Sequence, residues 1–401
     1  MQKFLDKNKY SIFCIVLTAL FWIIEVSVLG YAVYFLNENG YAASEIAILM
    51  AVTGIVAAVT QPFIGYYADS NKKIDFKNIL YVFGVIVILL FLGLLYFDKN
   101  KLVAGILFSA IYVFTNGMSP FVNSSCFYYK DRGMDVDYGV VRGFGSFSFA
   151  VFSYVLGSTT KLFGSKAVAI NGIVSAILFL LVAIIIPRVK DYKESNVTIE
   201  MKAKSSIEKN DTSFIMKYKA FTLILISTVL AICFQNADCG YLIQMITELG
   251  GDSYNLGVAN AIAAIVEIPI MFYISKLMKK ISLSKLILIA TFFYVLRGFV
   301  FTIPSMIALY MAQMMQMLTY AIIIPSTVYL SDEMMHEGDK NKGQTFVGLA
   351  VTMGFITGSF IGGQFIAIGG TSLLKVGCIV IAILSFIFAA LGHIVYAKTH
   401  K

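Results

Sequence analysis

Long apolar segments recur along the whole of this chain, separated mostly by short polar stretches. Each has about 20 residues or more, enough for a helix to cross a hydrocarbon layer about 30 Å thick. Backbone groups in lipid find no water to bind, so segments that cross it must be helices. The pattern predicts twelve membrane-spanning helices, over residues 10–36, 43–68, 78–97, 102–127, 138–160, 166–186, 219–247, 254–276, 283–303, 306–330, 344–368 and 372–396.

One long polar stretch lies between the sixth and seventh spans. It is charged and has no apolar run, as a linker does. We therefore expect a six-helix bundle over residues 1–186, a cytoplasmic linker over 187–218 and a second six-helix bundle over 219–401. Two equal halves around one linker indicate an internal repeat. The predicted fold class is an all-α membrane protein made of two pseudo-symmetric bundles.

The basic residues give the orientation of the spans. Of the 31 Lys and Arg residues, 24 lie in the terminal segments and in the loops on the same side, whereas four lie in the opposite loops. An excess of positive charge marks the cytoplasmic side of a membrane protein. We expect a multi-pass protein of the cell membrane with both termini in the cytoplasm.

Composition excludes several function classes. Charged residues make up 13% of the chain, about half the share in a soluble protein. The net charge of +8 is spread over short loops, so we expect no nucleic-acid partner. The five cysteines lie singly in apolar segments, and the three histidines form no cluster with carboxylates. We therefore expect no enzyme activity, metal, cofactor or obligate protein partner; the expected partners are the lipid bilayer and a small-molecule solute.

Ionisable residues within the spans are the strongest functional signal. Each costs a few kcal/mol or more at the centre of a bilayer, so it usually faces a cavity or a partner. Burial disfavours the charged form of a carboxyl group and a neighbouring arginine favours it, so a conformational change can switch its proton. We predict that Glu25, Asp238, Glu267 and Arg297 couple transport to H⁺. As an alternative, Glu267 and Arg297 only hold spans eight and nine together.

Further polar side chains lie within the spans. Arg142 lies about one turn inside span five, where it either faces a cavity or reaches the cytoplasmic surface. Amides and a phenol in other spans suit a polar organic solute, or else they join helices by hydrogen bonds. These are Asn116, Asn123, Gln235, Asn236, Gln316 and Tyr320.

A short motif follows span two. Gly65 permits close approach of a neighbouring helix, and Asp69 is followed by basic residues, among them Lys73. On the cytoplasmic side of the membrane, these residues are expected to form a conformational latch that holds in one state and releases in the other.

This loop, the twelve spans and the long middle loop resemble the major facilitator superfamily. Four stretches resemble, more narrowly, its oligosaccharide:proton symporter branch, which contains the lactose and phenylpropionate permeases. They are residues 61–65, 137–146, 267–271 and 294–297. The resemblance spans most of the chain, although each stretch is short.

The resemblance implies roles for individual residues. Arg142 is expected to bind substrate, Glu267 to join substrate binding to proton coupling, and Arg297 to tune the proton site. Asp238 lies near a branch aspartate that pairs with a lysine. Phe149 stands where the branch has a tryptophan that stacks on the sugar.

The chain also departs from the branch. The lysine partner for Asp238 is missing, the span-ten titratable positions fall near Tyr320 and Ile323, and the lone tryptophan, Trp22, lies in a different span. Glu25 is absent from the branch pattern. We expect it to fill the gap by pairing with Arg142 or with Arg297.

Together these features predict a secondary active transporter that works by alternating access. The expected activity is proton-coupled import of a small polar organic solute such as a sugar or a nucleoside. Two alternatives remain open. One is proton-driven efflux of amphiphilic drugs in the same fold, and the other is a membrane-embedded sensor or non-transporting partner.

Overall fold

A computed structural model describes residues 2–70, 76–97, 100–130, 132–185, 214, 216–336 and 339–399. These residues are almost wholly helical and include no strand. The helices of the first half are α1 (Gln2–Glu25), the π-helix η1 (Val26–Gly30), α2 (Ala32–Glu38), α3 (Ala43–Ser70), α4 (Phe76–Tyr96), α5 (Lys101–Lys130), α6 (Tyr138–Phe163) and α7 (Lys166–Ile184).

The second half follows the same plan with more interruptions. Its helices are α9 (Lys219–Gly240), α10 (Leu242–Glu248), α11 (Ser253–Met278), α12 (Leu283–Thr302), α13 (Met306–Met314), the 3₁₀-helix η2 (Met315–Leu318), α14 (Tyr320–Met334) and α15 (Lys340–Thr399). The pairs α9–α10 and α13–α14 each form one broken span.

The long helix α15 contains two spans. Its backbone leaves helical geometry at Gly369 (φ −140°, ψ 19°) and Gly370 (φ 63°, ψ −159°). A positive φ at Gly370 suits a residue without Cβ, so the chain can turn there. The break falls between the spans predicted at 344–368 and 372–396. Within the described ranges, eleven helical segments are long and apolar enough to cross a membrane, and the longest holds both of these spans. The predicted architecture of twelve spans in two bundles is confirmed.

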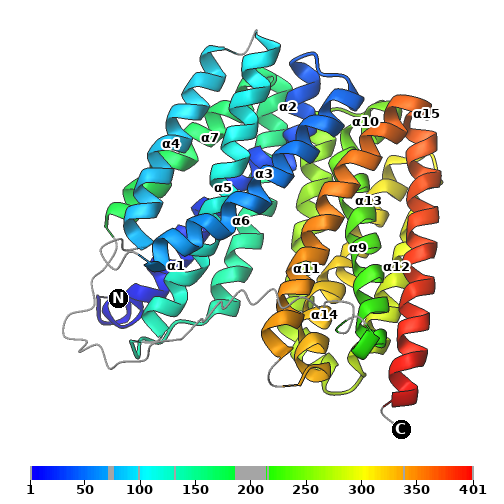
Figure 1. Ribbon diagram of the computed structural model, residues 1–401. Helices are drawn as coiled ribbons and strands as arrows, with labels where there is room; N and C mark the ends of the chain where they lie inside the picture. The colour runs from blue at the N-terminus through cyan, green and yellow to red at the C-terminus, as the bar shows by residue number, and fades with distance from the viewer. Residues whose placement is uncertain are drawn as a thin grey trace.

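The two bundles stand side by side, with both chain ends at the same end of the molecule (Figure 1). We call the opposite end, where α2 and α10 lie, the distal end. The halves meet along α6 and α11 and along α3 and α15. Residues 187–213 and 215 of the predicted linker lie outside the described residues. The boundaries at 186, 187, 218 and 219 therefore stay predictions.

Small residues let the halves approach closely near the distal end. A Cβ at Gly157 of α6 would lie 3.0 Å from the Cα of Gly257 of α11, and a Cβ at Gly257 would lie 3.0 Å from the Cα of Gly157. The hydroxyl of Tyr31 lies 2.9 Å from the carbonyl oxygen of Ser153 and 3.3 Å from that of Ser253, so it can donate to either half. Glycine at the crossing therefore brings the two backbones within reach of one side chain.

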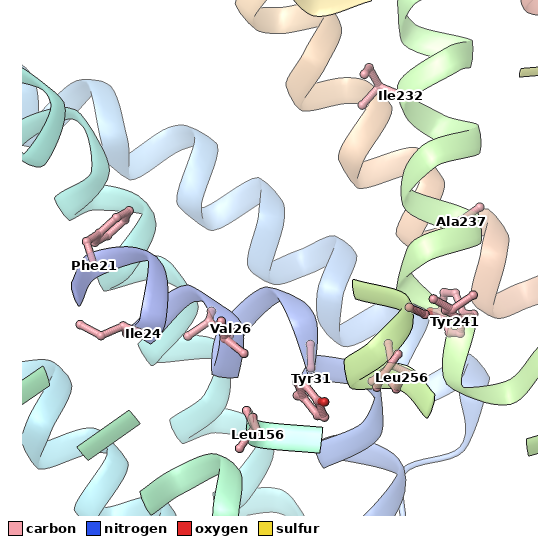
Figure 2. Close-up of a cluster of buried hydrophobic side chains, with 14 of the residues drawn as sticks. Phe21, Ile24, Val26, Tyr31, Leu156, Ile232, Ala237, Tyr241 and Leu256 are labelled. Carbon is pink, nitrogen blue, oxygen red and sulfur yellow. The ribbon is translucent and has the colours of Figure 1, made fainter. Parts of the chain in front are cut away.

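Polar and apolar contacts reinforce this crossing. Lys161 of α6 forms an ion pair with Asp252, which caps α11, at 2.9 Å. The Tyr154 and Tyr254 hydroxyls lie 3.2 Å apart. In Figure 2, Tyr31 lies beside Leu156 of α6 and Leu256 of α11, in the cluster of buried side chains. The halves are thus joined at the distal end in this conformation.

Candidate functional site: a cavity between the two halves

A cavity of about 440 Å³ lies between the two halves. Its volume falls in the range of small-molecule sites, about 300–1,000 Å³. Both halves contribute walls: α1, η1, α2, α3, α5 and α6 from the first, and α9, α11, η2, α14 and α15 from the second. The lining residues with polar or aromatic side chains include Trp22, Glu25, Tyr112, Asn116, Arg142, Ser146, Phe149, Gln235, Asn236, Asn260, Glu267, Gln316 and Tyr320.

Behind the wall of the second half, Arg297 forms an ion pair with Asp238. The Arg297 Nη2 atom lies 2.9 Å from Asp238 Oδ2, and the two side chains are 0% and 2% exposed. A charge buried this deeply is stable only with a partner. Asp238 therefore does have a basic partner, which comes from span nine and not from span ten as in the branch.

Three glutamines complete the shell around Arg297. Gln235 Oε1 and Gln316 Oε1 accept hydrogen bonds from Nη1 at 2.9 and 3.1 Å, and Gln313 Oε1 accepts from Nη2 at 3.2 Å. Gln316 then donates from Nε2 to Glu267 Oε1 at 2.7 Å. Through Gln316, the buried ion pair is connected to a carboxylate on the cavity wall. Arg297 and Glu267 thus meet through this amide and not directly.

The amide of Gln235 is fully engaged within the protein. Besides accepting from Arg297, its Oε1 accepts from the Tyr294 hydroxyl at 3.3 Å, and its Nε2 donates to Gln316 and to Cys239. Gln235 lines the cavity, as predicted for a substrate contact. In this conformation, however, its side chain organises the Arg297 network.

Arg142 turns toward the cavity instead of reaching the surface. Its guanidinium carbon lies 4.1 Å from the centre of the Trp22 ring, and its Nη1 donates to Ser146 Oγ at 3.2 Å. The Trp22 ring in turn meets Phe149 edge to face, with centroids 6.1 Å apart. Trp22 of span one therefore lines the same cavity as Arg142, although it lies in a different span from the tryptophan of the branch. Trp22 precedes Glu25 by three residues, so helical spacing already put both on one face of span one.

Glu25 is the last residue of α1, just before the π-helix Val26–Gly30. It lines the cavity with 3% exposure, beside the hydroxyl of Thr115. Across the described ranges it forms no ion pair, so the expected pairing with Arg142 or Arg297 is wrong. Arg297 is held by Asp238, whereas Arg142 rests on Trp22. π-helical turns often occur at functional sites.

The remaining residues predicted to bind substrate divide into two groups. Tyr320 lines the cavity, and so does Asn236, whose amide nitrogen clamps α9 to Phe355 and Ser359 of α15. Asn123 lies outside it, where its Oδ1 accepts from Tyr138 at 3.4 Å.

The predicted latch is only partly described. Gly65 lies in α3, and the backbone of Asp69 belongs to the same helix. The side chain of Asp69 and the whole of Lys73 lie outside the described residues. The role of this motif stays a prediction.

Sequence reasoning missed some lining residues. Asn260 donates from Nδ2 to the carbonyl oxygen of Gly30 at 3.1 Å, which joins α11 to the π-helix across the halves. Tyr112 lies one turn before the predicted Asn116 on α5. In the part of the chain that the structure describes, no three His, Cys, Asp or Glu side chains are grouped as metal ligands.

Comparisons with known proteins agree with this fold. A family model described as the MFS_1 like family matches residues 11–374. The uncharacterized transporter YwbF of Bacillus subtilis (strain 168) is 26% identical over 301 residues, which are 74% of this chain and 71% of that protein. The maltose permease of Geobacillus stearothermophilus is 23% identical over 350 residues, 86% of this chain and 82% of the permease.

Solved structures share the architecture at low sequence identity. The crystal structure of the nucleoside transporter NupG superposes with a TM-score of 0.77 at 15% identity, covering 96% of this chain and 99% of that one. A bacterial homolog to the human lysosomal transporter Spinster, inward-facing and occupied, gives a TM-score of 0.66 at 12% identity, with 98% of each chain covered. At these identities the likeness is one of fold.

Proposed function

This chain belongs to the MFS_1 like family and is a membrane transporter of the major facilitator type, and we propose that it imports a small polar organic solute together with protons. The two halves rock about a central site, so that the cavity opens to one side of the membrane at a time. A sugar or a nucleoside is the proposed solute.

The cavity wall supports a polar solute. It combines the ionisable groups of Glu25, Arg142 and Glu267 with the hydroxyl of Tyr320 and with aromatic side chains such as Phe149. Hydrogen-bonding groups on aromatic and apolar walls are typical of sites for small organic molecules. Among the relatives, one is named a maltose permease and one structure is that of a nucleoside transporter. We extend those two solute classes to this chain as part of the proposal.

The link from Glu267 to the buried ion pair is the observation that carries proton coupling. Glu267 is 8% exposed and faces the cavity, so both a solute and a proton can reach it. Its partner Gln316 also contacts Arg297. Glu267 lies on α11, Arg297 on α12 and Gln316 on η2, so movement of α12 relative to α11 changes the distance between the carboxylate and the positive charge, and movement of η2 breaks the link between them. Such a change alters the proton affinity of the carboxylate, which is what coupling requires.

The orientation follows from the charge bias of the loops. With both termini in the cytoplasm, the distal end faces the outside of the cell. The contacts of Tyr31, Gly157 and Gly257 then close the external side in the present conformation. Import requires these contacts to separate so that solute and proton can enter.

Reconstituted protein tests the proposal. Proteoliposomes containing a pH-sensitive dye are supplied with glucose, maltose, uridine or adenosine, and both solute uptake and internal pH are recorded. The wild type should acidify the lumen as the solute enters. Glu267→Gln should lose proton movement and uphill uptake, whereas the control Glu45→Gln, which breaks an exposed ion pair with Lys101, should retain both.

The same assay separates the alternatives. Normal proton-coupled uptake by Glu267→Gln would sink the assignment of the proton site. Proton-driven extrusion of lipophilic cations from loaded vesicles would identify an exporter. Binding of a solute without any flux would identify a sensor.

A further inference from the structure

Trp22 is the single tryptophan of the chain, and it lies on the cavity wall. One face of its indole ring carries the Arg142 guanidinium, 4.1 Å from the ring centre. A cation over a tryptophan face is attracted by the ring, more strongly when water is excluded. The contact joins α1 to α6, so it sets where the Arg142 side chain lies in the cavity.

The orientation of the indole is itself determined by a glycine. A Cβ at Gly145 would lie 2.5 Å from Trp22 Cδ1 and 2.9 Å from Nε1, and 3.2 Å from Thr18 Cγ2. No side chain larger than hydrogen fits there unless the indole moves. Gly145 lies three residues after Arg142 on α6, so one helix supplies both the space for the ring and the cation that rests on it.

This arrangement leaves donors of Arg142 available. A guanidinium is planar and carries five N–H groups that point outward in its plane. The flat face of the Arg142 guanidinium stacks on Trp22, and Ser146 Oγ accepts a hydrogen bond from one of its N–H groups at 3.2 Å. Within the described ranges, no protein acceptor is found for the others. Because Arg142 lines the cavity, these donors can bind two neighbouring acceptors of a solute side by side.

We propose that Trp22 is a positioning residue of the solute site. It fixes the Arg142 guanidinium so that its free edge binds a neutral solute carrying two adjacent acceptor oxygens, such as neighbouring hydroxyls of a sugar ring or a ribose. This proposal rests on the proposed transport function, which it deepens. Trp22 acts through Arg142, and its removal should weaken solute binding more than it slows turnover.

The first test needs no solute. Trp22 is the only tryptophan, so tryptophan fluorescence of the ligand-free protein reports on this ring alone. Arg142→Ala uncovers the face of the indole, so acrylamide should quench the emission more strongly, with Arg142→Lys between it and the wild type. The matched control is Arg132→Ala, which removes an arginine stacked on Tyr128 instead. Equal quenching in Arg142→Ala and in wild type would overturn the proposed contact.

The second test measures transport of labelled maltose and uridine by Trp22→Leu and Trp22→Phe. The KM of Trp22→Leu should rise about 3- to 30-fold with a smaller change in kcat; at about 1.4 kcal/mol per tenfold this is about 0.7–2 kcal/mol, the range of a cation–π contact. Trp22→Phe keeps an aromatic face and should restore most of the affinity. The control Phe292→Leu removes an exposed aromatic ring of α12 and should leave KM unchanged.

Gly145→Ala guards against a mere loss of folding in the Trp22 variants. It alters neither Trp22 nor Arg142, yet it displaces the indole, so both acrylamide quenching and KM should rise. An unchanged KM in Trp22→Leu would refute the positioning role, whether or not kcat falls. If the wild type transports neither solute, the proposed function fails, while the quenching experiment still decides whether Trp22 holds Arg142.

Discussion

Asp238→Asn leaves Arg297 charged in the interior of the second half. The two side chains are 2% and 0% exposed, with 2.9 Å between Oδ2 and Nη2. Removal of one partner from a buried ion pair costs about 3–5 kcal/mol, whereas replacement of both is often close to neutral. The glutamine oxygens that also accept from Arg297 remain in the variant. We therefore expect the lower end, about 3 kcal/mol.

This free energy translates into a measurable shift of the melting temperature. For a domain of about 150–250 residues, each kcal/mol shifts Tm by about 2–4 °C, so the single variant should melt about 6–12 °C below the wild type. The double variant Asp238→Asn with Arg297→Gln buries no unpaired charge and should recover most of the loss. A thiol-reactive dye gives the readout, since Cys233 and Cys378 are buried in the second half and react on unfolding.

An exposed ion pair provides the control. Asp332 and Lys340 lie 3.7 Å apart with side-chain exposures of 62% and 35%, so Asp332→Asn should change stability by less than about 1 kcal/mol. The reasoning is refuted if the Tm of the double variant of Asp238 and Arg297 is as low as that of Asp238→Asn. It is also refuted if Asp238→Asn has the same Tm as the wild type.

Three further predictions concern the distal end and the break in α15. The hydrogen bond from Lys161 holds the pKa of Asp252 below its ordinary value of about 3.9, so their ion pair stabilises the closed distal end above about pH 4 and is lost as the pH falls through the lowered pKa. Between pH 7 and pH 3, the wild type should lose up to about 1 kcal/mol more stability in thermal unfolding than Lys161→Gln, and identical losses would contradict this. Gly157→Val places a branched side chain where even a Cβ would lie 2.8 Å from the carbonyl oxygen of Ser253, so it should open the distal end. A membrane-impermeant thiol reagent should then label Ser253→Cys faster, and an unchanged labelling rate would contradict this. Gly370→Ala forces a side chain onto φ 63° and ψ −159° and should cost about 1–3 kcal/mol in thermal unfolding, so an unaltered Tm would show that the turn tolerates a Cβ.

The positions of the spans could be predicted because hydropathy is a property of consecutive residues. The break at Gly369 and Gly370 falls between the predicted spans at 344–368 and 372–396. The hydropathy pattern does not predict where a helix changes its geometry within a span. The π-helix Val26–Gly30 and the 3₁₀-helix Met315–Leu318 each interrupt a long, mostly apolar segment with a single polar residue, Ser27 or Gln316, so hydropathy does not mark them. They depend on how neighbouring helices pack.

Most of the ionisable residues of the candidate site could be predicted from the sequence, but the contacts between them could not. Glu25, Arg142 and Glu267 line the cavity, while Asp238 and Arg297 lie behind its wall. The pairing of Asp238 with Arg297 was missed because these residues are 59 positions apart on different helices. A helical period tells which residues share a face, and it does not tell which other helix that face meets.

Sequence by itself determined that this chain crosses the membrane twelve times in two halves and that charges lie within its spans. The free energy of transfer from water to lipid depends on the residues of each segment alone, so the spans, and the charged residues that are costly within them, can be identified one segment at a time. Only the tertiary structure decided that Gln235 is engaged by Arg297, that Asn123 lies outside the cavity and that Trp22 supports Arg142. Hydrogen bonds and ring contacts act over a few ångströms between helices, so they exist only once the helices are packed.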